Sequence, residues 1–132
     1  MQIAGCLACE YCHTKGSGQC VQKDAMREIY SLLEEAEMLV IATPIYYFGF
    51  SGQLQCIINR LYAVGIPKNL KKSALILSSG SEDVYDGAIY EYKNTFVNFM
   101  NLTDMGIYTA HGAENKTEEK LEKFRTFGKS IN

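Results

Sequence analysis

Residues 38–54 read MLVIATPIYYFGFSGQL, and this stretch carries most of the information about the fold. Its first residues, MLVIAT, form a short apolar run, as expected for a strand buried on both faces of a parallel sheet. Pro44 lacks a backbone N–H and should stop regular pairing, so PIYYFGF (44–50) is predicted to be a loop. Ser51 is a favourable N-cap for a helix over residues 52–65. The stretch therefore predicts strand, loop and helix in succession.

Apolar residues at helical spacing define the helices on either side of this loop and strand. Asp24 is expected to cap a helix over residues 25–37. The residues predicted to face the core are Met26, Ile29, Leu32 and Leu33 in this helix, and Leu54, Ile57, Ile58 and Leu61 in the helix after Ser51. Each helix therefore offers one apolar face to a sheet.

The second half of the chain repeats this alternation. The predicted elements are a strand over 73–79, a loop over 80–87, a helix over 88–102, a weaker strand over 106–111 and a helix over 118–130 capped by Thr117. The predicted inner positions of the helices are Ile89, Tyr92, Phe96, Phe99, Met100, Leu121 and Phe124. Strands and helices alternating at this spacing imply right-handed crossovers and a parallel sheet. We therefore predict one α/β domain of the doubly wound kind over residues 1–132.

The composition argues against several classes of protein. The chain has 132 residues, of which 47% are hydrophobic, so it can bury a core. Its formal net charge of −2 provides no basic footprint for nucleic acid. The first residues do not resemble a signal peptide, and the longest apolar run, residues 38–50, is interrupted by Pro44 and too short to cross a membrane. We expect a cytoplasmic protein without nucleic-acid or membrane partners.

The loops predicted at the carboxyl ends of the first two strands are rich in Gly, Ser and Tyr. Ligands bind at this edge of open parallel sheets. A flat aromatic ligand can lie against the aromatic residues 46–48. Backbone amides at Gly49, Ser79 and Gly80 would then bind the edges of that ligand. The alternative is that the aromatic side chains fill the end of the sheet or an oligomer interface.

Four cysteines, Cys6, Cys9, Cys12 and Cys20, lie within CLACEYCHTKGSGQC (6–20). In a reducing compartment, clustered cysteines more often bind metal or carry out redox chemistry than form structural disulfides. Several alternatives stay open on the residues alone. The loop can hold an iron–sulfur cluster, or zinc with four thiolates or with His13 in place of one. It can also be empty, with disulfides such as Cys9–Cys20 forming in air.

The remaining reactive side chains indicate no further catalytic group. Cys56 stands alone in a predicted helix and is expected to be a small buried apolar residue. His111 follows the last strand and is expected to be a hydrogen-bonded loop residue. Neither a Ser–His–Asp arrangement nor a carboxylate pair emerges, so no catalytic side chain is assigned. This pattern is consistent with redox chemistry carried by a cofactor.

Taken in order along the chain, the motifs resemble those of flavodoxin-like NAD(P)H-dependent FMN reductases, and especially the iron–sulfur flavoprotein branch. The matching segments are CxxCxxC with a fourth cysteine after HTKGSGQ, then KDAM (23–26), ATPIYYFGFSGQL (42–54), INRLY (58–62) and LILSSGSED (75–83). The resemblance implies a three-layer α/β/α fold. It also implies that FMN takes a hydride from NAD(P)H, and that a small molecule or a protein accepts the electrons.

The resemblance also implies which residues would bind the cofactors. The residues expected beside the FMN ring are Thr43, Pro44, Ile45, Tyr46, Tyr47, Phe48, Gly49, Ser79, Gly80 and Ser81. The residues expected to hold a four-iron four-sulfur cluster are Cys6, Cys9, Cys12 and Cys20.

The sequence departs from this family in two respects. Ala25, Gln55 and Asn59 stand where acidic, lysine and aspartate residues are usual. Only MQIAG precedes Cys6, where the family has a strand, a phosphate-binding loop and a helix. On this basis we expect an N-terminally truncated domain, weakened FMN binding and an open strand edge near MLVIAT. Such an edge predicts a homo-oligomer, a dimer or tetramer, with an apolar interface there or at the aromatic loop.

The leading hypothesis is therefore a flavin-dependent NAD(P)H oxidoreductase similar to iron–sulfur flavoproteins. Two alternatives belong to other classes. One is a non-catalytic, truncated flavodoxin-like domain that dimerises without flavin, and the other is a zinc-stabilised interaction module.

Overall fold

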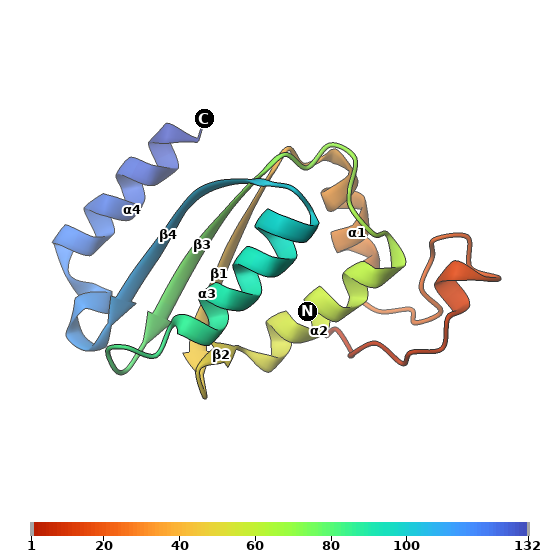
Figure 1. Cartoon of the computed structure of the whole chain (residues 1–132), viewed down its shortest axis with the longest axis horizontal. Helices are drawn as coiled ribbons and strands as arrows, with labels where there is room; N and C mark the ends of the chain where they lie inside the picture. The colour runs from red at the N-terminus through yellow and green to blue at the C-terminus, as the bar shows by residue number, and fades with distance from the viewer. Residues whose placement is uncertain (1, 132) are drawn as a thin grey trace.

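The computed structural model describes residues 2–131, which form a mostly parallel sheet with helices packed against it (Figure 1). The strands are β1 (Met38–Tyr46), β2 (Gly49–Phe50), β3 (Lys72–Ser79) and β4 (Thr103–His111). The α-helices are α1 (Met26–Glu35), α2 (Gly52–Arg60), α3 (Asp86–Tyr92) and α4 (Glu118–Ser130). Shorter helices of other kinds are η1 (Tyr11–His13), η2 (Leu61–Ala63), η3 (Lys93–Phe99) and η4 (Gly112–Lys116).

The strand order in the sheet is β2-β1-β3-β4. β3 runs parallel to both β1 and β4, while β2 pairs antiparallel with the end of β1. In Figure 1, α3 lies in front of the sheet, while α2, α1 and the cysteine loop lie to the right of β1. This arrangement confirms the predicted α/β class. It also brings the carboxyl ends of the parallel strands β1, β3 and β4 to the same end of the sheet.

The core lies between the sheet and its helices. Leu75 and Leu77 of β3 are fully buried, and they belong to one apolar cluster with Met26, Tyr92 and Phe96. The Tyr92 hydroxyl is buried without loss of hydrogen bonding, because it lies 2.9 Å from the Ser73 hydroxyl. It also donates to Asp104 at 3.0 Å. Burial, together with the bond to Asp104, raises the pKa of Tyr92 to about 12, so the hydroxyl keeps its proton.

Two predicted helix caps are confirmed. The Ser51 hydroxyl accepts a hydrogen bond from the Leu54 amide at the start of α2. The Thr117 hydroxyl accepts from the Lys120 amide at the start of α4. Each cap satisfies an N–H group that the first turn of a helix leaves without a partner.

β1 differs from the prediction in its length and in its burial. The strand continues through Pro44, which lies opposite Ser78, so residues 44–46 are not a loop. Proline is tolerated because β1 is an edge strand from Met38 to Pro44 among residues 2–131. The strand is also not buried on both faces. Ile41 is buried, but Val40 is 39% exposed, as in a strand that is covered on one face.

Three predicted core positions on helices are exposed: Phe99, Leu32 and Leu121. After Tyr92, the helix continues as the π-helix η3. A π-helix holds more residues per turn than an α-helix, so the apolar periodicity shifts and Phe99 is turned outward, 70% exposed. In α1, Leu33 is buried but Leu32 is 65% exposed, because only one side of the helix is covered. Leu121 is 38% exposed, because α4 buries Phe127 instead.

Asp24 and Arg60 form an ion pair that joins the two ends of the cysteine loop. The Arg60 guanidinium is 1% exposed and donates to both Asp24 carboxylate oxygens, at 2.9 and 3.1 Å. Arg60 also donates to the Ala4 carbonyl at 2.9 Å, and the Ala4 amide donates to Asp24 at 3.1 Å. Ala4 precedes the first cysteine and Asp24 follows the last. α1 begins at Met26, whose amide donates to Asp24, so the predicted role of Asp24 at this helix end is confirmed in part.

The hydrogen bonds from Arg60 lower the pKa of the Asp24 carboxyl to about 2. We therefore expect Asp24→Asn to lower the free energy of unfolding by about 3 kcal/mol at pH 7, because the Arg60 charge stays buried without its counter-charge. A depressed pKa contributes stability that is present above the unfolded value and lost as the pH falls through the folded value. The difference in free energy of unfolding between wild type and variant should therefore become smaller as the pH falls from about 4 to about 2. Urea denaturation at a series of pH values measures this difference.

Glu119→Gln is the matched control for this substitution. Glu119 pairs with Lys123 on the surface and is 77% exposed, so its loss should change stability by less than about 0.5 kcal/mol. If the two substitutions lowered the free energy of unfolding by equal amounts, the Asp24–Arg60 pair would not have the stabilising role assigned to it.

Candidate functional site

The turn between β1 and β2 is built from two aromatic residues in an uncommon conformation. Tyr46 pairs with Gly49, which leaves Tyr47 and Phe48 as a two-residue hairpin loop. Their φ angles are 48° and 66°. Such a loop normally has Asn and Gly at these positions, because positive φ angles strain larger side chains. Tyr47 and Phe48 therefore adopt a backbone conformation that large side chains disfavour.

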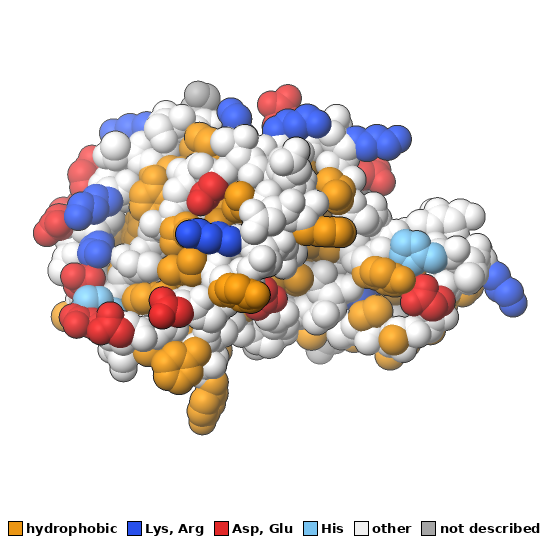
Figure 2. Space-filling model, viewed as in Figure 1, with side chains coloured by type: hydrophobic (Ala, Val, Ile, Leu, Met, Phe, Trp, Pro, Cys, Tyr) orange, Lys and Arg blue, Asp and Glu red, His pale blue; other side chains and the backbone are white. Residues whose placement is uncertain are grey.

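The aromatic side chains of this turn face solvent. Tyr46 is 61% exposed, Tyr47 is fully exposed and Phe48 is 62% exposed. Figure 2 shows hydrophobic side chains protruding at the lower edge of the molecule, where Figure 1 places the turn. They do not fill the end of the sheet, so that part of the alternative is wrong, while a place in an oligomer interface stays open. An exposed aromatic surface of this kind is able to stack on a planar ligand.

Contacts behind the turn hold it in position. The Thr43 side chain is buried, 3.2 Å from the Ser51 hydroxyl, and accepts a hydrogen bond from the Ser51 amide. Thr43 thus connects β1 to the start of α2 and does not face the ligand edge. On the other side, a Cβ atom at Gly87 would lie 2.5 Å from the Phe48 carbonyl oxygen. Only glycine allows α3 to approach the turn so closely.

The loop after β3 lies beside this turn, because Pro44 and Ser78 are opposite each other in the sheet. The Ser79 hydroxyl donates to the Ser81 carbonyl at 2.6 Å and lies 2.7 Å from the Tyr85 hydroxyl. It is therefore occupied by the protein itself. The backbone at Gly80 and Ser81 is exposed, and within residues 2–131 neither amide takes part in a loop or turn hydrogen bond. These two amides are therefore available to a ligand as hydrogen-bond donors.

Two side chains at the end of the sheet fix this loop. Tyr85 donates to the Ala110 carbonyl at 2.9 Å, and Asn115 donates to the Ser79 carbonyl at 3.0 Å. The sequence offered no signal for either contact, since both depend on the order of the strands.

His111 lies between two carboxylates at the end of β4. Its Nε2 is 2.7 Å from Glu82 of the β3 loop, and its Nδ1 is 3.2 Å from Glu114 of η4. The hydrogen bond from Lys120 lowers the pKa of the Glu114 carboxyl, and His111 adds to this effect. The predicted polar contacts of His111 are confirmed, but the residue is the last one of β4 and not part of a loop. His111 links the loop after β3 to η4.

The cysteine loop projects from the other end of α2 (Figure 1). Cys6 and Cys9 are exposed, Cys12 and Cys20 are half-buried, and all are free thiols. The Nε2 atom of His13 lies 2.8 Å from the Tyr62 carbonyl oxygen. Cys56, on α2, is half-buried and not fully buried as predicted. Gly5, just before the cysteine loop, lies close to its sulfur atom.

The donor set of this loop fits an iron–sulfur cluster chemically, because four free thiols lie within one short segment. Within residues 2–131, however, no three metal-binding side chains are gathered close enough to hold a metal ion. Binding would require the loop to close around the cluster. Figure 1 also shows that this loop, at the right of the view, lies apart from the β1–β2 turn at the bottom.

Comparison with known proteins identifies relatives for most of the chain. A family profile described as NADPH-dependent FMN reductase matches residues 2–115. An iron–sulfur flavoprotein from Archaeoglobus fulgidus is 29% identical over 137 aligned positions, which cover 98% of this chain and 60% of that protein. An iron–sulfur flavoprotein from Methanocaldococcus jannaschii is 41% identical over 70 positions, covering 53% of this chain and 34% of that protein. The chain thus spans less than two thirds of the length of either relative.

A solved structure confirms the predicted flavodoxin-like fold. The Trp repressor binding protein from Bacillus subtilis superposes with a TM-score of 0.60 and 23% identity, over 81% of this chain and 68% of that one. Within residues 2–131, no helix is long and apolar enough to cross a membrane.

Tyr85→Phe tests how the loop after β3 is held. Removing the hydroxyl breaks its contacts with Ser79 and Ala110, so we expect a loss of about 1 kcal/mol of stability and faster amide exchange over residues 80–85. Hydrogen exchange by mass spectrometry measures this. Tyr90→Phe, at a position 73% exposed, is the control and should leave exchange unchanged. If both variants exchanged at the wild-type rate, the Tyr85 contacts would not hold the loop.

Proposed function

Because the chain belongs to the NADPH-dependent FMN reductase family, we propose that it is a flavin-dependent oxidoreductase that uses NAD(P)H. The observation that carries this proposal is the aromatic turn at the carboxyl end of β1. Tyr47 and Phe48 occupy a two-residue loop with positive φ at both positions, and both are exposed. Since this conformation favours Asn and Gly, the aromatic side chains are kept at a cost to the fold, which is typical of a binding site.

The proposed ring site joins this turn to the loop after β3. Tyr46, Tyr47 and Phe48 would provide the apolar surface against the isoalloxazine ring. The exposed amides of Gly80 and Ser81 would donate hydrogen bonds to the polar edge of the ring. Bound FMN supplies the hydride acceptance and the one-electron release. The protein positions the ring and excludes water from one face of it.

The cysteine loop would hold a second redox centre. We propose that Cys6, Cys9, Cys12 and Cys20 ligate a four-iron four-sulfur cluster, supported by their free thiols and by the similarity to iron–sulfur flavoproteins. The Asp24–Arg60 pair would hold the two ends of the loop together, which limits the conformations that the loop must lose when it closes.

The double substitution Tyr47→Asn with Phe48→Gly tests the ring site. Asn-Gly suits the turn, so we expect thermal stability to rise by about 1 kcal/mol. FMN affinity, measured by quenching of flavin fluorescence, should fall by about tenfold or more, because the stacking surface is lost. A stability gain without loss of affinity would contradict the proposed site. Tyr90→Ala, at an exposed position on α3, is the control and should bind FMN as wild type does.

Anaerobic purification with a visible spectrum and metal analysis tests the two cofactors in the wild-type protein. We expect flavin absorption after FMN addition, a broad band near 400 nm from the cluster, and about four irons per chain. Colourless protein that binds neither added FMN nor metal would instead support a non-catalytic domain. One zinc per chain would support the interaction module.

We also propose that a second copy of the chain covers the open edge of β1. This edge is unpaired from Met38 to Pro44 among the described residues, and β1 contains no charged side chain. Two such strands can pair antiparallel about a two-fold axis without burying charge. The exposed Val40 would then lie in the interface.

Sedimentation velocity at micromolar concentration tests this assembly. Wild type should sediment as a dimer or tetramer, and Val40→Lys should shift it toward monomer, because the new charge would be buried at the edge. Leu32→Lys, which changes another exposed apolar residue on α1, should leave the assembly intact. A wild-type monomer would contradict the proposal.

A further inference from the structure

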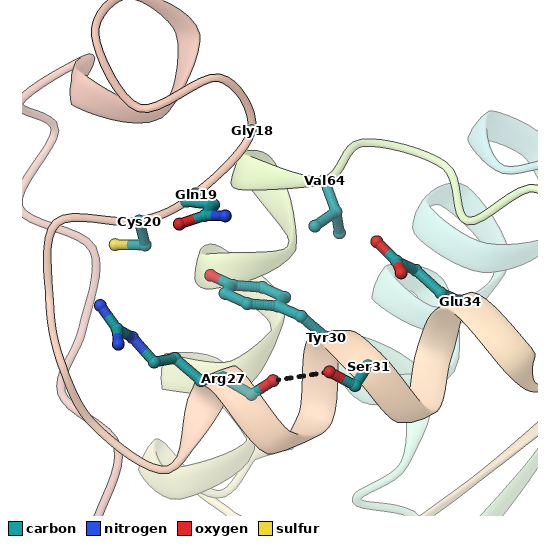
Figure 3. Close-up of a pocket in the computed structure, with 8 residues that line it drawn as sticks. All are labelled: Gly18, Gln19, Cys20, Arg27, Tyr30, Ser31, Glu34 and Val64. Carbon is teal, nitrogen blue, oxygen red and sulfur yellow. Dashed lines mark hydrogen bonds between the residues drawn. The ribbon is translucent and has the colours of Figure 1, made fainter.

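Two hollows meet at Cys20, where the cysteine loop returns to α1. The first, of about 380 Å³, lies between the loop and α1 and is lined by Gly18, Gln19, Cys20, Arg27, Tyr30, Ser31, Glu34 and Val64 (Figure 3). The second, of about 330 Å³, is lined by residues of the loop and of its return to α1, and it shares Gln19, Cys20 and Arg27 with the first. Figure 3 shows the guanidinium end of Arg27 reaching toward Cys20. Cys20, one of the four cysteines proposed to ligate the iron–sulfur cluster, therefore borders both hollows.

The second hollow is strongly basic. Lys15, Lys23 and Arg27 line it, and its lining contains no Asp or Glu. Within residues 2–131, none of these three cations has a carboxylate at salt-bridge distance. This concentration of positive charge departs from the chain as a whole, which carries a net charge of −2.

Two carboxylates next to lining residues in the chain, Glu10 and Asp24, are bound to other side chains. Glu10 accepts a hydrogen bond from the Tyr62 hydroxyl at 3.2 Å. Asp24 is committed to Arg60. Glu34 lines only the first hollow, at its far end from Cys20 in Figure 3. Like charges gathered without counter-charges repel one another and create a positive potential that attracts anions. The uncompensated charge thus lies where a ligand can reach it, next to a proposed redox centre.

We propose that the basic hollow is the docking site for a small electron acceptor that carries several negative charges, such as phosphate or carboxylate groups. The inference rests on the proposed function and names the acceptor class for it. The size of the hollow suits a small molecule and not a folded protein domain. Lys15, Lys23 and Arg27 bind the anionic groups, and Cys20 borders the same space. With ferricyanide as the probe the exchange is balanced: NAD(P)H loses a hydride, two ferricyanide ions each gain one electron, and one proton is released.

A charge-neutralising triple variant, Lys15→Gln with Lys23→Gln and Arg27→Gln, tests the site kinetically. We measure kcat/KM with NADPH for ferricyanide, which is anionic, and for a neutral benzoquinone. The ratio of the two values should fall about tenfold in the variant, and added salt should lower the wild-type ratio in the same direction. The matched control removes three exposed, unpaired lysines from other elements, through Lys93→Gln, Lys116→Gln and Lys129→Gln. An equal fall in both triple variants, or no fall in either, would overturn the inference.

Titration of the full chain with inorganic pyrophosphate, followed by amide NMR shifts, tests the same site without catalysis. Saturable shifts confined to residues 15–27 and absent from the Lys15/Lys23/Arg27 variant would support it. Weak shifts spread over the surface would mean an adventitious ion only and would contradict it. This readout separates the two proposals, because a protein that reduces neither acceptor contradicts the proposed function, whereas the pyrophosphate shifts decide the docking site.

Discussion

The ion pair between Asp24 and Arg60 is the constraint on which the cysteine-loop end of the molecule depends. Arg60 is on α2, in the core, while Asp24 and Ala4 lie at the two ends of the cysteine loop. A single buried guanidinium therefore closes a long, otherwise exposed segment and attaches it to the rest of the fold. Most residues of the loop are exposed, Cys6 and Cys9 among them. Its position is determined by electrostatics at its base and by the contact between His13 and Tyr62.

The two candidate centres are built by different physical means. At the β1–β2 turn, the parallel sheet fixes where the two loops lie, and a strained, exposed aromatic pair forms the proposed binding surface. At the cysteine loop, the backbone is held at its ends and the thiols remain free between them. The first centre is preformed, whereas the second must change shape to bind metal. A flavin site gains from a rigid surface, and a cluster gains from a loop that can fold around it.

Much of the fold could be predicted because it depends on local signals. Ser51 and Thr117 were recognisable as caps, and the apolar run of β3 as a strand, from residues that are neighbours in the chain. The prediction failed where distant contacts decide the outcome. Val40 is exposed because β1 lies at the edge of the sheet, and Phe99 is exposed because η3 is a π-helix, and neither fact is visible in apolar periodicity. The Tyr85 and His111 contacts depend likewise on which strands are neighbours.

The close contact between Gly87 and Phe48 makes α3 and the aromatic turn one mechanical unit. No side chain lies between the two backbones to absorb movement, so a displacement of the first turn of α3 passes directly to the tip of the hairpin. At its other end, α3 runs into the wider, less regular geometry of η3. A shift of α3 relative to the sheet would therefore also move the backbone of Phe48 and, with it, the exposed aromatic side chains of the turn.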